Sequence, residues 1–120
     1  MEIREATAAD VPTVRELFRE YAAGLGIDLC FQRFDEELAG LPGSYAPPSG
    51  RLFVAWDNET PAGCVAFRPL DGPRCELKRL YVRPAFRGRG LGRLLATHAL
   101  QEAEAAGYGS ACLDTLPSMA

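Results

Sequence analysis

The stretch that decides the fold is LYVRPAFRGRGLGR, residues 80–93. Its apolar start, residues 80–82, is typical of a β-strand, and Pro84 ends that strand because proline lacks an N–H for the ladder. Glycine then stands at the alternate positions 88, 90 and 92, and a helical pattern begins at residue 91. This order predicts a strand, a glycine turn and a helix.

The glycine turn has the features of a phosphate-binding site. Glycine allows the backbone to come close to a ligand and to adopt positive φ angles. A helix that begins at such a turn offers unpaired first-turn N–H groups and the positive end of its dipole. Both favour phosphate oxygens. We therefore expect the turn to bind a phosphorylated cofactor.

The charge of the chain is unevenly distributed. The net charge is −3, yet residues 74–93 hold seven basic residues against one acid, Glu76, so this segment is +6 and the remainder is −9. Such a basic island in an acidic chain favours a compact anionic ligand over a nucleic-acid surface. The alternative is that these basic residues merely solvate a strand edge and a turn. We expect no nucleic-acid partner.

The composition is that of one globular domain, residues 1–120, with 48% hydrophobic and 24% charged residues. No run approaches the roughly 18 apolar residues of a membrane span, and the first residues lack the apolar core of a signal peptide. Cysteines stand at positions 30, 64, 75 and 112, without the C-x-x-C pair of a zinc or redox motif. These features predict a cytoplasmic protein with reduced thiols, no membrane partner and no metal, with one disulfide as the alternative.

The apolar periodicity predicts an α/β domain with a mixed, mainly antiparallel sheet flanked by helices. Short turns join three middle strands into an antiparallel meander, and the last helix connects the last two strands as a right-handed parallel crossover. Strands are predicted over residues 3–6, 52–56, 62–67, 75–82 and 110–116. Helices are predicted from an N-cap at Asp10 to Gly24, over residues 34–41 and over residues 91–106.

Two other nucleotide-binding motifs fit the glycine turn less well. A Walker P-loop needs lysine and then serine or threonine after its last glycine, but Arg93 and Leu94 stand there. A dinucleotide-binding fold needs G-x-G-x-x-G and an acid about 20 residues further on. Asp114 lies near that place, but the glycines have the wrong spacing. A dinucleotide site therefore stays the weaker alternative.

The sequence resembles the GCN5-related N-acetyltransferase (GNAT) family, whose signature is Gln/Arg-x-x-Gly-x-Gly/Ala between a strand and a helix. Here RGRGLG, residues 87–92, fills that signature. The resemblance also includes ELKRLYV at residues 76–82, the Arg83-Pro84 break, the alanine-rich helix and CLDT at residues 112–115. It covers nearly the whole chain. The helix and the two strands that end the family fold are missing, so the domain is expected to be C-terminally short.

The resemblance implies acetyl-coenzyme A as the cosubstrate. Its diphosphate would meet the N–H groups of the glycine turn beside one or more arginines, and its pantetheine arm would lie along the preceding strand. The expected cofactor-binding residues are Leu80, Tyr81, Val82, Arg87, Gly88, Arg89, Gly90, Leu91, Gly92 and Arg93.

Acetyl transfer to an amine needs a base for the amine proton and a donor for the thioester oxygen. Glu76 is the expected catalytic base, because several family members carry a glutamate six residues before the position of Val82. It could equally be a salt-bridge partner within the basic island. A backbone N–H of residues 80–82 is the expected oxyanion donor. The family's usual general acid, a tyrosine in a later helix, has no counterpart here and stays unassigned.

Other reactive residues have simpler explanations. Cys75 and Cys112 could form an acetyl-cysteine, but buried thiols usually fill a core. His98 is expected to have a packing or surface role, and Trp56 is expected in the core. The irregular region where the family shapes its acceptor pocket holds Asp28, Phe31, Glu36, Glu37 and Tyr45. Acids in this region either hold a cationic amine or solvate the surface.

The sequence therefore predicts an acetyl-CoA-dependent N-acetyltransferase that acts by direct attack of a primary amine, carried by a small molecule or a protein. The alternatives are a non-catalytic CoA-binding domain and, less favoured, a dinucleotide-binding protein. The last strand is expected to have an exposed edge. Either the chain is shortened there, or a partner covers the edge, for example a second copy in a homodimer.

Overall fold

Five strands form one sheet in the order β1-β2-β3-β4-β5 in the computed structural model, which describes residues 1–25 and 34–113. Neighbouring strands from β1 to β4 are antiparallel, whereas β5 is parallel to β4. The strands are β1 (Glu2–Glu5), β2 (Arg51–Asp57), β3 (Thr60–Asp71), β4 (Arg74–Val82) and β5 (Ser110–Leu113). The helices are α1 (Val11–Leu25), α2 (Phe34–Ala39) and α3 (Leu91–Ala105), with 3₁₀ turns η1 (Ala8–Asp10), η3 (Gly43–Tyr45) and η4 (Pro84–Phe86).

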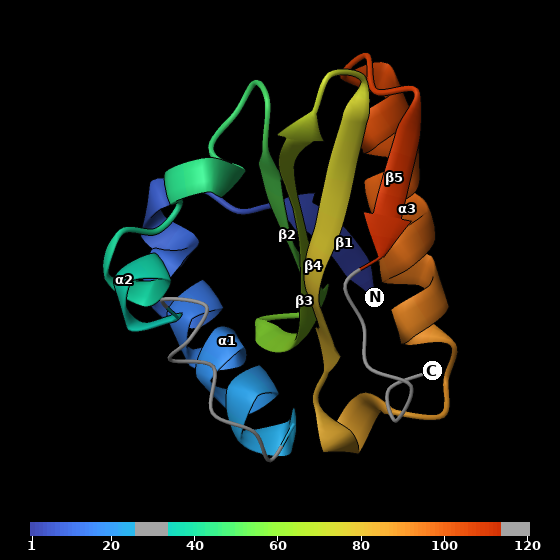
Figure 1. Ribbon diagram of the computed structural model, residues 1–120. Helices are drawn as coiled ribbons and strands as arrows, with labels where there is room; N and C mark the ends of the chain where they lie inside the picture. The colour runs from blue at the N-terminus through green and yellow to red at the C-terminus, as the bar shows by residue number, and fades with distance from the viewer. Residues whose placement is uncertain (26–33, 114–120) are drawn as a thin grey trace.

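Helices cover both faces of the sheet: α1 and α2 lie on one face and α3 on the other (Figure 1). Side chains alternate between the two faces along a strand. In β2, Leu52 and Val54 therefore pack toward α1, while Phe53 and Ala55 pack toward α3. Because both faces are covered, the middle of β2 and β3 is buried and continuously apolar.

The predicted fold class is confirmed, as are the antiparallel meander and the parallel crossover. The middle strands are longer than predicted, because tight turns centred on Asn58 and Gly72, both with positive φ, join them. α1 begins at Val11, directly after Asp10, so Asp10 stands at the predicted N-cap position. Its carboxylate accepts the Thr7 N–H at 2.9 Å, a contact across the turn η1 that precedes α1. Of the last predicted strand, residues 114–116 lie outside the described residues.

Strands β3 and β4 approach closely at Gly63, which lies opposite Val82. A Cβ atom at this glycine would lie 2.5 Å from the Tyr81 carbonyl oxygen and 3.3 Å from the Val82 Cα. It would also lie 3.2 Å from a methyl group of Leu95 in α3. Glycine is therefore required for β4 to keep its position against β3.

A hydrogen-bonded ion pair links α1 to the end of β4. Glu20 accepts Arg83 Nη2 at 2.7 Å and Arg83 Nε at 3.0 Å, and it also accepts the Tyr81 hydroxyl at 3.1 Å. The hydrogen bond from Arg83 lowers the pKa of Glu20, although partial burial opposes it. The pair holds the end of β4 just before the glycine turn begins.

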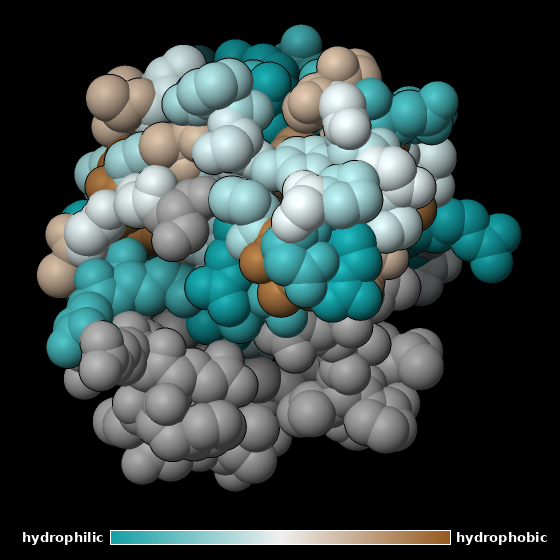
Figure 2. All heavy atoms as spheres, turned by 45° about the horizontal axis from the view of Figure 1, so that its top comes forward, coloured by the Kyte–Doolittle hydropathy of each residue, from teal (hydrophilic) through white to brown (hydrophobic). Residues whose placement is uncertain are grey.

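None of the described helices combines the length and the apolar character needed to cross a membrane. The face that carries the β3–β4 turn and the α3–β5 connection presents mostly hydrophilic side chains (Figure 2). Hydrophobic side chains appear there only in small, separate spots. This face therefore offers no broad apolar patch.

We expect Gly63→Ala to lower the free energy of unfolding by about 1–3 kcal/mol, because the added methyl group pushes β4 away from β3. Urea unfolding measures the change. Gly24→Ala in α1 is the matched control, since a Cβ there meets nothing within 4 Å. The control should be neutral or stabilising by up to about 1 kcal/mol. Equal stability of the two variants would contradict the close strand packing.

We expect Glu20→Gln to destabilise the fold at neutral pH by about 0.2–1 kcal/mol, the usual value of a half-exposed ion pair. A carboxylate with a lowered folded-state pKa stabilises the fold above its unfolded pKa and loses this effect as the pH falls through the folded value. The difference between wild type and variant should therefore shrink in acid. Urea midpoints across a pH series measure it, and a difference that grows in acid would refute the pairing.

Candidate active site

The glycine turn connects η4 to α3 through a backbone that only glycine adopts easily. Gly88 has φ +81° and Gly90 has φ +75°, and Gly90 caps the first turn of α3. Leu91 and Leu95 anchor this end of α3 in the core. The N–H groups of the first helical turn have no partner within a helix, so they are available to an anion at the turn.

The basic island separates into paired and unpaired arginines. Arg74 pairs with Asp71, Arg79 with Glu37 and Arg83 with Glu20. Within residues 1–25 and 34–113, no acid forms an ion pair with the remaining three, which are all exposed. They are Arg87, Arg89 and Arg93. The positive charge available to a ligand is therefore concentrated at the glycine turn.

A β-bulge interrupts β4 at Arg79. Cys64 pairs with Tyr81 and Ala66 with Lys78, so β4 has one residue more than β3 in this interval. Arg79 has φ +62°, a conformation that costs a non-glycine residue about 1–2 kcal/mol. The Cys64 thiol donates to the Arg79 carbonyl at 3.3 Å and supports this backbone.

The bulge changes which residues of β4 face each helix layer. Before it, Cys75 and Leu77 pack in the core next to α3; after it, Leu80 and Val82 do so. The N–H of Arg83 donates to Ala62, so Val82 lies at a position whose N–H and C=O point away from β3. Its carbonyl accepts Arg87 Nε at 2.9 Å. Beyond the bulge, β4 thus has a backbone edge that leads to the glycine turn.

Among the expected cofactor-binding residues, Tyr81 differs from its neighbours. Its register places its backbone groups toward Cys64 of β3, and its ring packs on the α1 side of the sheet. The Arg87 guanidinium lies 5.8 Å from the centre of that ring. Val82 is therefore the expected cofactor-binding residue of β4 whose backbone groups are directed away from β3.

Glu76 lies on β4, opposite Arg68 of β3. Its Oε1 accepts Arg68 Nε at 3.1 Å and Arg68 Nη2 at 3.0 Å. The side chains are 20% and 37% exposed, respectively, so the pair reaches solvent. The contact is compatible with both roles expected for Glu76, that of a catalytic base and that of a salt-bridge partner, because an arginine can also orient a catalytic carboxylate.

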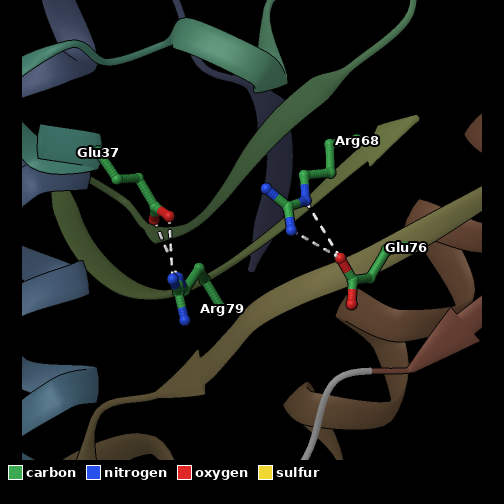
Figure 3. A network of polar contacts seen from close by, with 4 residues as sticks. All are labelled: Glu37, Arg68, Glu76 and Arg79. Atoms are coloured by element: carbon green, nitrogen blue, oxygen red, sulfur yellow. Dashed lines mark hydrogen bonds and ion pairs between the residues drawn. The ribbon is translucent and has the colours of Figure 1, made fainter. Parts of the chain in front are cut away.

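A second, more deeply buried pair lies near the first one (Figure 3). Arg79, 1% exposed, donates Nε and Nη2 to the two carboxylate oxygens of Glu37 in α2, both at 2.9 Å. The hydroxyl of Tyr45 is buried near Glu37. Burial, and then the charge of Glu37, raise the pKa of this phenol. A neutral O–H donor therefore lies beside the two pairs.

The other candidate residues lie apart from this arrangement. Cys75 is buried in the core next to α3, and burial raises its pKa, which makes it a poor nucleophile. His98 packs edge-on against Phe53 at 4.8 Å, so its predicted packing role is confirmed. Trp56 is only partly buried at the edge of the core. Glu36 is exposed, whereas Asp28, Phe31 and Asp114 lie outside the described residues.

Sequence reasoning missed Arg68 and Arg79. Arg79 had a detectable signal, since Lys78-Arg79 interrupts an otherwise apolar strand that must be buried. Arg68 had none, because a charged residue near a strand end is normally solvated. Only the register between β3 and β4 brings it opposite Glu76.

The comparisons with known proteins agree with one another. The family model described as "Acetyltransferase (GNAT) family" matches residues 11–119. An uncharacterized N-acetyltransferase of Schizosaccharomyces pombe is 46% identical over 112 residues, which span 92% of this chain and 69% of that protein.

Solved structures show the same fold. A GCN5-related N-acetyltransferase from Ralstonia eutropha superimposes with a TM-score of 0.81 at 22% identity, over 98% of this chain and 84% of that one. A "predicted acetyltransferase with acetyl-CoA" from Clostridium acetobutylicum gives a TM-score of 0.74 at 17% identity, over 98% and 82%. With the family model and the yeast relative, they lead to one conclusion: the chain belongs to the acetyltransferase (GNAT) family, as an acyltransferase.

Proposed function

We propose that this chain transfers the acetyl group of acetyl-coenzyme A to a primary amine by direct attack. One observation carries the proposal: the backbone edge of β4 beyond the Arg79 bulge leads directly to the glycine turn. An extended chain that ends in phosphates would need both features, in that order. The structure of the Clostridium acetobutylicum protein with acetyl-CoA supports this cosubstrate for a related fold.

The residues of the turn fit a diphosphate. Positive φ at Gly88 and Gly90 turns successive N–H groups toward one side, as in other anion-binding turns. Leu91, Gly92 and Arg93 begin α3 and add first-turn N–H groups. The exposed Arg87, Arg89 and Arg93 supply positive charge. We therefore assign the phosphate end of the cosubstrate to these residues.

The pantetheine arm is assigned to the edge of β4. At Val82 the backbone N–H and C=O groups point away from β3, so an extended ligand could pair with them as a further strand would, and we assign Leu80 to the same edge. Arg87 now donates to the Val82 carbonyl and would have to give up this bond. A backbone N–H of the same segment would donate to the acyl oxygen as negative charge develops there.

The reaction that follows needs one base. Acetyl-coenzyme A supplies an activated thioester carbonyl. The neutral amine nitrogen of the acceptor forms a bond to the carbonyl carbon, the carbon–sulfur bond breaks, and the thiolate leaves with the electron pair and takes a proton from solvent. Glu76 takes the amine proton, directly or through a water molecule. Arg68 orients the Glu76 carboxylate from the neighbouring strand.

The test is the release of free coenzyme A thiol from acetyl-coenzyme A across a panel of small primary amines and peptides. Release that depends on an amine, with an N-acetylated product found by mass spectrometry, supports the transferase. Saturable binding of acetyl-coenzyme A without release would instead indicate a non-catalytic CoA-binding domain. Binding of NAD with no competition by coenzyme A would indicate a dinucleotide site.

We expect Gly90→Ala to weaken coenzyme A binding by about tenfold or more, since an alanine resists positive φ and would turn the N–H groups away from the phosphates. Titration calorimetry with coenzyme A measures the affinity. Gly107→Ala is the matched control, because Gly107 also has positive φ but lies at the opposite end of α3. An equal loss in both variants would mean that backbone strain, and not the binding site, was measured.

We expect Glu76→Gln to lower kcat by roughly 100-fold or more, which is the usual contribution of a general base. The affinity for acetyl-coenzyme A should change little. Asp71→Asn, which removes a carboxylate from the exposed Arg74 pair of the same hairpin, is the control and should keep full activity. Full turnover of the Glu76 variant at saturating substrate across the pH range would remove Glu76 from the mechanism.

A further inference from the structure

Two arginine–glutamate pairs lie close together on the face of the sheet that α1 and α2 cover (Figure 3). We call Glu37, Arg68, Glu76 and Arg79 the charged cluster. Each acid in it is already paired with an arginine. The charged cluster thus has no surplus negative charge that would attract a polycationic acceptor such as a polyamine.

Within the charged cluster, the Arg68–Glu76 pair is the more exposed, since Arg68 is 37% exposed whereas Arg79 is 1% exposed. Both Arg68 nitrogens that contact Glu76 approach the same oxygen, Oε1. Arg68 Nη1 and Glu76 Oε2 take part in no hydrogen bond or ion pair with a described residue. Among the described residues, the pair therefore keeps one donor of the cation and one acceptor of the anion open, on opposite sides of the Arg68–Glu76 contact.

We propose that the acceptor is an amino acid or a similar small amino carboxylate, whose carboxylate binds Arg68 while its amine meets Glu76. This rests on the proposed function, with Glu76 as the base. A zwitterion carries both complementary charges, so its carboxylate can bind the outer Arg68 nitrogen while its amine end reaches the outer Glu76 oxygen. Arginine suits a carboxylate because its planar guanidinium donates parallel hydrogen bonds in a fixed geometry.

The buried Arg79–Glu37 pair holds the backbone next to the proposed acceptor site in place. Arg79 is held by the two hydrogen bonds that it donates to Glu37, in a backbone bulge that directly follows the segment with Glu76. The Tyr45 hydroxyl is buried next to these charges.

The experiment compares amino acids with their methyl esters as acceptors, since the ester keeps the amine and the side chain but loses the negative charge. Thiol release gives kcat/KM for each member of a pair. We expect the wild-type protein to prefer the free amino acid by about tenfold or more in kcat/KM, mainly through KM. Equal use of acid and ester would overturn the assignment, as would acetylation of peptides blocked at the carboxyl end in preference to amino acids.

Arg68→Gln tests the residue itself. Because Arg68 also orients Glu76, its loss should lower kcat for every acceptor, but only a binding role would also abolish the preference for the free acid. The readout is therefore the ratio of kcat/KM for acid and ester, which should fall to near one. Arg74→Gln, at an exposed pair of the same hairpin, should keep the wild-type ratio. A ratio unchanged in Arg68→Gln would refute the proposal.

Binding separates this proposal from the proposed function. Titration calorimetry of amino acids and of their esters, with coenzyme A present, reports the acceptor site without turnover. Binding of the free acid that is lost in Arg68→Gln supports the site even if no thiol is released, in which case only the transferase assignment fails. Absence of binding for every amino acid overturns the site.

Discussion

The bulge at Arg79 is the constraint on which the rest of the structure depends. A strained, left-handed residue in the middle of a buried strand persists only when its surroundings hold it. Here the Glu37 carboxylate holds the guanidinium and the Cys64 thiol holds the carbonyl. Breaking such a buried pair leaves an uncompensated charge, which costs about 3–5 kcal/mol. We therefore infer that the Arg79–Glu37 pair matters more for holding the backbone conformation at Arg79 than for the free energy of folding.

Three consequences follow from that one extra residue. It reverses the alternation of side chains along β4, so that Leu80 and Val82 pack against the α3 side. It leaves the backbone groups of Val82 directed away from β3. It also brings the end of β4 to the glycine turn, where Glu20 fixes it through Arg83. A bulge next to a functional site is a common way to redirect a strand.

The sequence was sufficient to predict those parts of the fold that depend on local contacts. The glycine turn, the helix that follows it and the meander all rest on contacts between residues near in the chain, and their turn residues are distinctive. The sequence was not sufficient to predict the ion pairs that the tertiary fold brings together. Glu37 and Arg79 are 42 residues apart, and the sequence around each residue does not indicate that the two form a pair. The contact of Arg68 with Glu76 depends on strand register, which an irregularity in β3 between Pro69 and Asp71 shifts.

The most direct test of this account is the hydrogen exchange of the backbone amides at Leu80 and Val82, measured by NMR with and without coenzyme A. If the bulge directs these groups to a ligand edge, coenzyme A should slow their exchange together with that of the turn residues from Gly88 to Arg93. The Tyr81 amide, already paired with β3, should change little. Protection of the turn alone, or of neither segment while coenzyme A is bound, would contradict the account.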